Sequence, residues 1–184
     1  LRKKLKIKNN SRILLSVGRL GKEKSIDFLI KAFKIVSKKD KDAILVIVGE
    51  GMEMKNLRDL AKELNLQDKV CFLGNIDSEY MPQVYKDADI FLFASTTETQ
   101  GLVILEAMAS GLPVVAVDDS ALADVIRSNR NGILSHKDIN EYAKNTLQLL
   151  ENDNFRRQII RNALFDVSNY AIVKTADVLE KLYL

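Results

Sequence analysis

Short, uniformly apolar runs recur along this chain, separated by longer stretches in which apolar residues have helical spacing. Because the runs do not alternate apolar with polar residues, they predict strands that are buried on both faces of a parallel sheet. A turn at Asn131 and Gly132 precedes the last of them. The predicted strands are residues 13–17, 43–48, 70–73, 90–93, 114–117 and 133–134.

Between these runs the apolar spacing predicts amphipathic helices. Ser25 is placed to cap the first helix, whose apolar face is Ile26, Leu29, Ile30, Phe33 and Val36. Others are predicted on the face Met54, Leu57, Ala61 and Leu64, over 79–86, from about Gly101, and briefly around Asp124. The terminal region has stripes at Tyr142, Ala143, Thr146, Leu147 and Leu150, then at Phe155, Ile159, Ile160 and Ala163, and a closing helix over 171–183. This order predicts an α/β fold with an open, doubly wound, mostly parallel six-stranded sheet of the Rossmann-like kind.

Length and composition favour a single domain. The chain has 184 residues, of which 47% are hydrophobic, enough to bury one core. Residues 11–184 are predicted to form that domain, and the basic residues 1–10 a linker to another one. Since the chain begins with Leu1 rather than Met, we expect it to be a piece of a longer protein.

Charge and cysteine content exclude several classes of function. The net charge is only +3, and no Lys or Arg lies between Lys86 and Arg127, so we expect no nucleic-acid partner. The lone Cys71, in an apolar run, favours a reducing, cytoplasmic compartment. No run is apolar enough to span a membrane, and no signal-peptide pattern is present. With one His and no carboxylate cluster we expect no metal site, and Asp118 and Asp119 are interpreted as caps.

The centre of the chain carries a candidate anion site. The apolar run 90–93 leads into a polar loop that ends at Gly101, where a helix is predicted to begin. The amides of Gly101, Leu102 and Val103 would then lie at the helix start, which suits a phosphate group. Glu98 would lie on the loop and Glu106 inside the helix, so that both carboxylates could face one ligand.

This stretch resembles the nucleotide-sugar site of the retaining glycosyltransferases of family four, which have two Rossmann-like domains in a GT-B architecture. Their pattern of two Glu residues separated by seven others is matched by Glu98 and Glu106. The resemblance implies that Glu98 contacts the donor sugar, that the amides after Gly101 hold the diphosphate, and that Glu106 binds the ribose hydroxyls. Gln100, also expected in the donor site, stands where the family often has Phe.

Other departures bear on substrate and local structure. Ala94 replaces the usual Pro. The run from Thr99 to Gly101 is similar to some bacterial glycolipid glucosyltransferases, which favours a UDP-glucose-like donor. A buried amphipathic helix flanked by solvated acids is the structural alternative.

A second motif lies after the first predicted strand, where open α/β sheets place ligands. Gly18, Arg19 and Lys24 resemble the basic loop with which the family clamps the donor diphosphate. Ser25 stands where the family usually has Gly. A solvated turn is the alternative interpretation of this loop.

In the same family the backbone after the third strand contacts the nucleobase. Asn75 and Ile76, which follow Gly74, are therefore candidates for that role, with a plain turn as the alternative. Gly49 and Gly51 are a weak signal for nucleotide binding. They would either let the backbone approach a nucleotide or only turn the chain.

The resemblance implies the donor-binding, carboxyl-terminal half of a retaining glycosyltransferase, with Glu98, Arg19 and Lys24 as catalytic residues. It would move a hexose from a nucleoside diphosphate sugar to a hydroxyl, without metal or cofactor, on a glycolipid or cell-surface glycan. Its partners would be the donor, an unknown acceptor and the missing amino-terminal domain, through which the full-length protein would contact a membrane. A non-catalytic nucleotide-sugar-binding module and half of a sugar-nucleotide epimerase are the alternatives.

Overall fold

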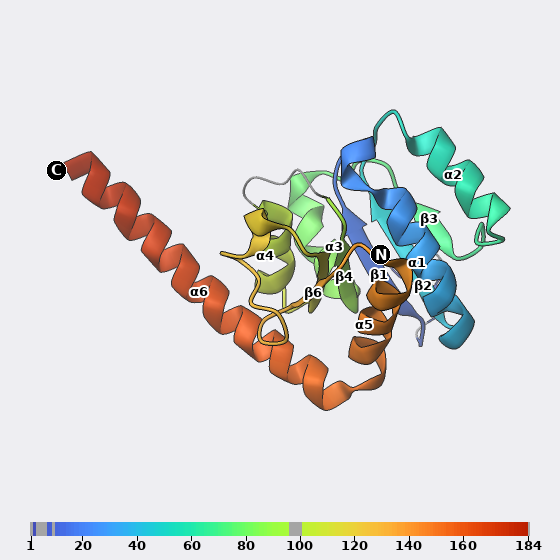
Figure 1. Ribbon diagram of the computed structural model, residues 1–184. Helices are drawn as coiled ribbons and strands as arrows, with labels where there is room; N and C mark the ends of the chain where they lie inside the picture. Colours follow the sequence, from blue (N-terminus) through green and yellow to red (C-terminus); the bar gives the residue numbers. More distant parts are fainter. Residues whose placement is uncertain (1, 3–6, 9, 96–100, 184) are drawn as a thin grey trace.

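The computed structural model describes residues 2, 7–8, 10–95 and 101–183, and the side chains of those up to residue 169. Within these ranges the fold is one parallel sheet with helices on both faces (Figure 1). The predicted positions Glu98 and Gln100 lie outside the described residues.

The six strands pair in the order β3-β2-β1-β4-β5-β6, and every pair is parallel. The predicted doubly wound, six-stranded sheet is therefore confirmed. The strands are β1 (Arg12–Val17), β2 (Ala43–Val48), β3 (Val70–Phe72), β4 (Ile90–Phe93), β5 (Val114–Val117) and β6 (Ile133–Ser135).

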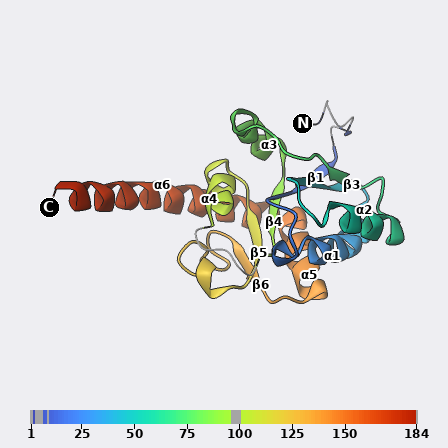
Figure 2. The same ribbon diagram turned by 90° about the horizontal axis from the view of Figure 1, so that it is seen from above.

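Helices cover both faces, as Figure 2 shows from above. The helices are α1 (Ile26–Lys39), α2 (Met54–Glu63), α3 (Met81–Asp87), α4 (Leu102–Ala109), α5 (Ile139–Glu151) and α6 (Asp153–Tyr183). Short 3-10 helices span Lys22–Lys24, Ser78–Tyr80 and Ser120–Leu122. Strand side chains alternate between two cores: Leu14 packs with α1, α2 and α5, whereas Ile13 and Leu15 pack with α3, α4 and Ala163 of α6.

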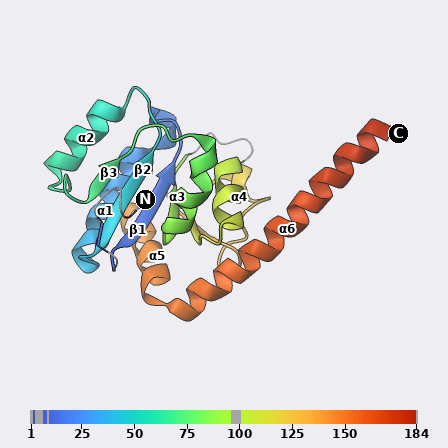
Figure 3. The ribbon, with the colours of Figure 1, turned by 180° about the vertical axis from the view of Figure 1, so that it is seen from behind.

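Two predicted elements differ from the structure. The apolar stripe that begins at Phe155 and the predicted closing helix over 171–183 belong to one continuous helix, α6. Its carboxyl end extends beyond α4 (Figure 3). The short helix expected around Asp124 is a 3-10 turn at Ser120–Leu122 followed by irregular turns.

Backbone contacts tie together the loops that follow β1, β2 and β3. A Cβ atom on Gly49 would lie 2.0 Å from the carbonyl oxygen of Gly18, and one on Gly51 would lie 2.3 Å from that of Leu20. The amide of Gly49 donates to the carbonyl of Gly74 at 2.8 Å, and the amide of Leu20 donates to the carbonyl of Glu50 at 2.8 Å. The paired glycines thus let two backbones approach each other.

A buried tyrosine links α5 to the middle of the sheet. The hydroxyl of Tyr142 accepts a hydrogen bond from the amide of Phe93 at 3.0 Å and donates one to the carbonyl of Val115 at 2.7 Å. Tyr142 is fully buried. Its hydroxyl therefore satisfies polar groups on β4 and β5 that water does not reach.

We expect Gly49→Ala to lower the free energy of unfolding by about 2–5 kcal/mol, because a steric clash of about 1–3 kcal/mol adds to the cost of about 1–2 kcal/mol for a side chain at positive φ. Gly111 is the matched control: its φ is also positive, at 77°, but the nearest atom to an added Cβ is 4.0 Å away. Gly111→Ala should cost about 1–2 kcal/mol. Urea denaturation measures both, and equal losses would refute the close approach as the cause.

Tyr142→Phe should lower the free energy of unfolding by about 1–3 kcal/mol, because it leaves buried backbone groups of β4 and β5 without their partner. The same substitution at Tyr80, which is 58% exposed, should change it by less than about 0.5 kcal/mol. Denaturation curves that coincide for the two variants would contradict this role of the hydroxyl.

Candidate functional site

An open cavity of about 480 Å³ lies at the carboxyl edge of the sheet. Its walls come from the loops after β1, β2 and β3 and from α4, which follows β4. Neighbouring strands β1 and β4 mark the point where the strand order reverses, and ligands of open α/β sheets bind at such a switch point. The cavity brings together five predicted site residues: Gly18, Arg19, Asn75, Ile76 and Glu106.

Glu106 reaches the cavity from α4. The helix begins at Leu102, next to the start that the sequence predicts near Gly101. Gly101 itself has a positive φ of 59°. The buried face of α4 is formed by Ile104, Ala107 and Met108, so Glu106 lies on the opposite, exposed side. This places the carboxylate where a ligand can reach it.

The start of α4 fits the predicted anion site. In a helix the first amides have no intrahelical acceptor, and here these belong to Leu102 and Val103. The Leu102 residue is 57% exposed. These amides, together with the positive end of the helix dipole, are suited to a phosphate group.

A buried hydroxyl holds the Glu106 carboxylate. Tyr85, on α3, is 2% exposed and donates its hydroxyl proton to Oε2 of Glu106 at 2.7 Å. Burial raises the pKa of Tyr85, and the hydrogen bond to Glu106 raises it further. Sequence reasoning missed Tyr85, although a tyrosine on the apolar side of a helix signals that its hydroxyl needs a partner.

The basic loop after β1 carries both predicted basic residues and an ion pair. Arg19 lines the cavity, whereas Lys24 ends the 3-10 helix Lys22–Lys24 and is not among the lining residues. Nη2 of Arg19 donates to Oε1 of Glu23 at 2.7 Å. The backbone amide of Glu23 and then Arg19 lower the pKa of the Glu23 carboxyl, with a smaller contribution from the charge of Lys24. Glu23 is thus a counter-charge in the proposed diphosphate clamp that the sequence pattern did not reveal.

The prediction that Ser25 caps α1 with its side chain is wrong. Ser25 adopts the left-handed conformation, with a φ of 49°, and makes no side-chain cap. Its hydroxyl instead accepts a hydrogen bond from Nζ of Lys137 at 2.9 Å. The backbone conformation explains why glycine suits this position, since only glycine adopts it without strain.

Asn75 and Ile76 border two adjoining hollows. They line the cavity described above and also one of about 370 Å³ that contains Tyr80 and Val84. Nδ2 of Asn75 donates to Oε2 of Glu50 at 3.3 Å. The side-chain amide of Asn75 is therefore oriented by Glu50, which lies on the loop after β2. The sequence did not indicate this contact.

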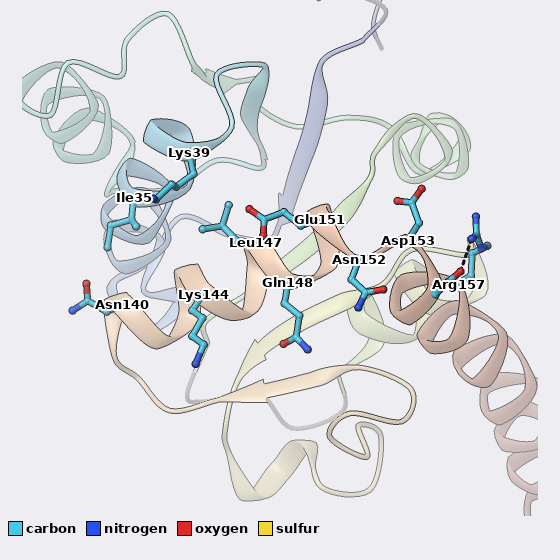
Figure 4. Close-up of a pocket in the computed structure, with 11 residues that line it drawn as sticks. Ile35, Lys39, Asn140, Lys144, Leu147, Gln148, Glu151, Asn152, Asp153 and Arg157 are labelled. Atoms are coloured by element: carbon cyan, nitrogen blue, oxygen red, sulfur yellow. Dashed lines mark hydrogen bonds between the residues drawn. The ribbon is translucent and has the colours of Figure 1, made fainter.

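A larger hollow, of about 1170 Å³, lies elsewhere. Figure 4 shows that its lining comes from α1, α5 and the start of α6, where Arg157 donates to Asn154. The end of α1 at Lys39 and the end of α5 at Glu151 place it toward the amino edge of the sheet. It contains none of the predicted site residues, so it is not the candidate site.

The single histidine and the acids that were interpreted as caps lie outside the lining of the candidate cavity. Asp119 accepts from the amide of Ala121 at 3.0 Å, which confirms its capping role. His136 is exposed, and the Glu141 carboxylate beside it raises the pKa of the imidazole. No group of three potential metal ligands occurs among the described residues. Over the same ranges, no helix combines the length and apolar character needed to cross a bilayer.

Comparison with known proteins relates this geometry to a family. A family model described as glycosyl transferases group 1 matches residues 1–164. The alpha-monoglucosyldiacylglycerol synthase of Streptococcus pneumoniae is 40% identical over 134 residues, 73% of this chain and 30% of that protein. The synthase of the same name from Acholeplasma laidlawii is 32% identical over 184 residues, 100% of this chain and 46% of the relative.

A solved structure has the same fold over nearly the whole chain. Anabaena HepE, determined in complex with UDP and glucose, has a TM-score of 0.90 and 26% identity. The similarity covers 98% of this chain and 50% of HepE. The chain therefore spans half or less of the length of these three proteins.

Proposed function

We propose that this chain, which belongs to the glycosyl transferases group 1 family, binds the nucleotide-sugar donor of a retaining glycosyltransferase. Its sheet is one half of a GT-B architecture, the fold of HepE and other structural neighbours. The family match favours this function over a sugar-nucleotide epimerase. A UDP-sugar donor is supported by HepE, which was solved with UDP and glucose.

One observation carries the proposal. Arg19 follows β1 and Glu106 follows β4, yet both reach the same cavity at the switch point of the sheet. A guanidinium can bind phosphate oxygens in pairs, and a carboxylate can accept hydrogen bonds from the two hydroxyls of a ribose. A nucleoside diphosphate has both groups in one molecule.

The other residues complete the proposed site. Lys24 and the amides of Gly101, Leu102 and Val103 would stabilise the diphosphate, and the backbone of Asn75 and Ile76 would contact the base. Gly18 allows the β1 loop to approach the ligand. Glu98 and Gln100, outside the described residues, are proposed to contact the sugar.

In the proposed reaction the bond between the anomeric carbon and the diphosphate oxygen breaks, and the acceptor hydroxyl oxygen bonds to the same carbon on the same face. The acceptor proton is released, and negative charge develops on the leaving diphosphate. Arg19, Lys24 and the first amides of α4 are proposed to stabilise that charge.

The acceptor would be bound by the other half of a longer enzyme. Relatives named as diacylglycerol glucosyl synthases support glucose as the sugar and a glycolipid as the product. We therefore propose a cytoplasmic enzyme that contacts the membrane through its partner domain.

Arg19→Ala and Lys24→Ala should each weaken UDP binding roughly tenfold or more, since a charge-assisted hydrogen bond contributes about 1.5–3 kcal/mol. Binding of uridine should change little, because it has no diphosphate. Calorimetric titration of both ligands is the measurement.

Two controls sharpen this test. Lys31 on α1 forms an exposed ion pair with Asp27 at 2.9 Å, outside the cavity lining, and Lys31→Ala should leave both affinities unchanged. Combining Arg19→Ala with Glu23→Ala removes the pair without leaving the Glu23 charge behind. Equal weakening of UDP and uridine would show that the basic loop does not clamp phosphate.

The two carboxylates of the central motif should have different effects. Glu106→Gln should weaken both UDP and UDP-glucose, by about 1–3 kcal/mol if the ribose loses its charged acceptor. Glu98→Gln should leave UDP binding nearly intact and reduce only the additional affinity due to glucose. If both acids only repelled the phosphates, binding would be unchanged or tighter in all four titrations.

A further inference from the structure

The hydrogen bond between Tyr85 and Glu106 joins a buried side chain to an exposed one. Tyr85 is 2% exposed, and its ring packs on Phe91 with 6.0 Å between ring centroids. Its hydroxyl is thereby held at a fixed point next to the cavity wall. Glu106 is exposed on the outer side of α4.

Without that contact, Glu106 would sample several conformations. A helical glutamate has two common χ1 wells and three χ2 wells, so about six rotamers are open to it. The 2.7 Å bond to Oε2 selects the rotamers that meet the tyrosine hydroxyl. The second oxygen, Oε1, makes no hydrogen bond to any residue in the ranges that the structure describes.

The direction of this hydrogen bond is also fixed. An ionised carboxylate only accepts hydrogen bonds, so the phenol must donate its proton. Because burial raises the pKa of Tyr85, the phenol keeps that proton throughout the neutral range. Tyr85 itself is absent from the cavity lining and would not touch a ligand there.

We propose that Tyr85 is a positioning residue that holds Oε2 of Glu106 so that Oε1 receives the vicinal hydroxyls of a ribose in the cavity. This inference rests on the proposed function, because it assumes that a nucleoside diphosphate occupies the site. It adds a residue from α3, outside both sequence motifs, to the determinants of ribose recognition.

The rotamer count sets the size of the effect. If the carboxylate of a Tyr85→Phe variant spreads over about six rotamers, affinity for a ribose ligand should fall roughly three- to sixfold. Removing the hydroxyl leaves an exposed carboxylate that water can solvate, while the phenyl ring keeps its packing on Phe91. The variant should therefore fold.

The test compares two nucleotides by calorimetry. UDP has the vicinal hydroxyls, and 2′,3′-dideoxyuridine 5′-diphosphate lacks them. Tyr85→Phe should weaken UDP three- to sixfold and leave the dideoxy nucleotide unchanged. Thr146→Val is the matched control, since it deletes another buried hydroxyl, one that donates to the carbonyl of Tyr142, and should change neither affinity.

A double-mutant cycle tests whether the tyrosine acts through the carboxylate. In a Glu106→Ala background, where residue 106 has no acceptor for the hydroxyl, Tyr85→Phe should cause no further loss of UDP affinity. Independent, multiplicative losses would overturn the inference, as would equal weakening of the two nucleotides by Tyr85→Phe.

Failure of the inference and of the proposed function give different results. If the unmodified chain discriminates between the two nucleotides and Tyr85→Phe discriminates equally well, the inference alone is overturned. If the unmodified chain does not bind UDP, the proposed function fails and the inference fails with it.

Discussion

The carbonyl oxygen of Gly18 occupies the space where a side chain at residue 49 would begin. This close approach fixes the β1 and β2 loops to each other, and the bond from Gly49 to Gly74 extends the arrangement to the β3 loop. Arg19, Glu50 and Asn75 are carried by these three loops. The geometry of these three loops thus depends on residues 49 and 51 having no side chain. This backbone packing explains the two glycines without a ligand contact.

Acidic groups give the site a selective character. Arg19 and Lys24 are accompanied by the carboxylates of Glu23, Glu50 and Glu106. At a separation of about 4 Å, near a protein surface, a carboxylate and a phosphate repel by about 4 kcal/mol. An inorganic diphosphate would meet this repulsion, whereas a nucleotide offsets part of it by donating ribose hydroxyls. In the proposed site these acids would therefore favour a diphosphate that is attached to a ribose over a free diphosphate.

The sequence was sufficient for the sheet and for the positions of the motifs, because buried parallel strands have uniform apolar runs and helices repeat at a regular spacing. It was insufficient for the groups that orient the site. Tyr85 resembled any apolar helix position until α3 and α4 were placed together, and Glu23 resembled a solvated acid until the loop folded back on Arg19. Ser25 resembled a cap because composition does not encode the sign of φ. Tyr85 depends on a tertiary contact, whereas Glu23 and Ser25 depend on the backbone conformation of one short loop, which residue spacing does not specify.

The Tyr142 hydroxyl has a consequence for the order in which the protein is made. It is contributed by α5 but satisfies polar groups of β4 and β5, the nearer of which precede it by 27 residues along the chain. As the nascent chain leaves the ribosome, the amide of Phe93 and the carbonyl of Val115 remain without this partner until residue 142 has emerged. The β4–β5 pair, which its own parallel register already joins, therefore gains this additional tie between its strands only after α5 has docked.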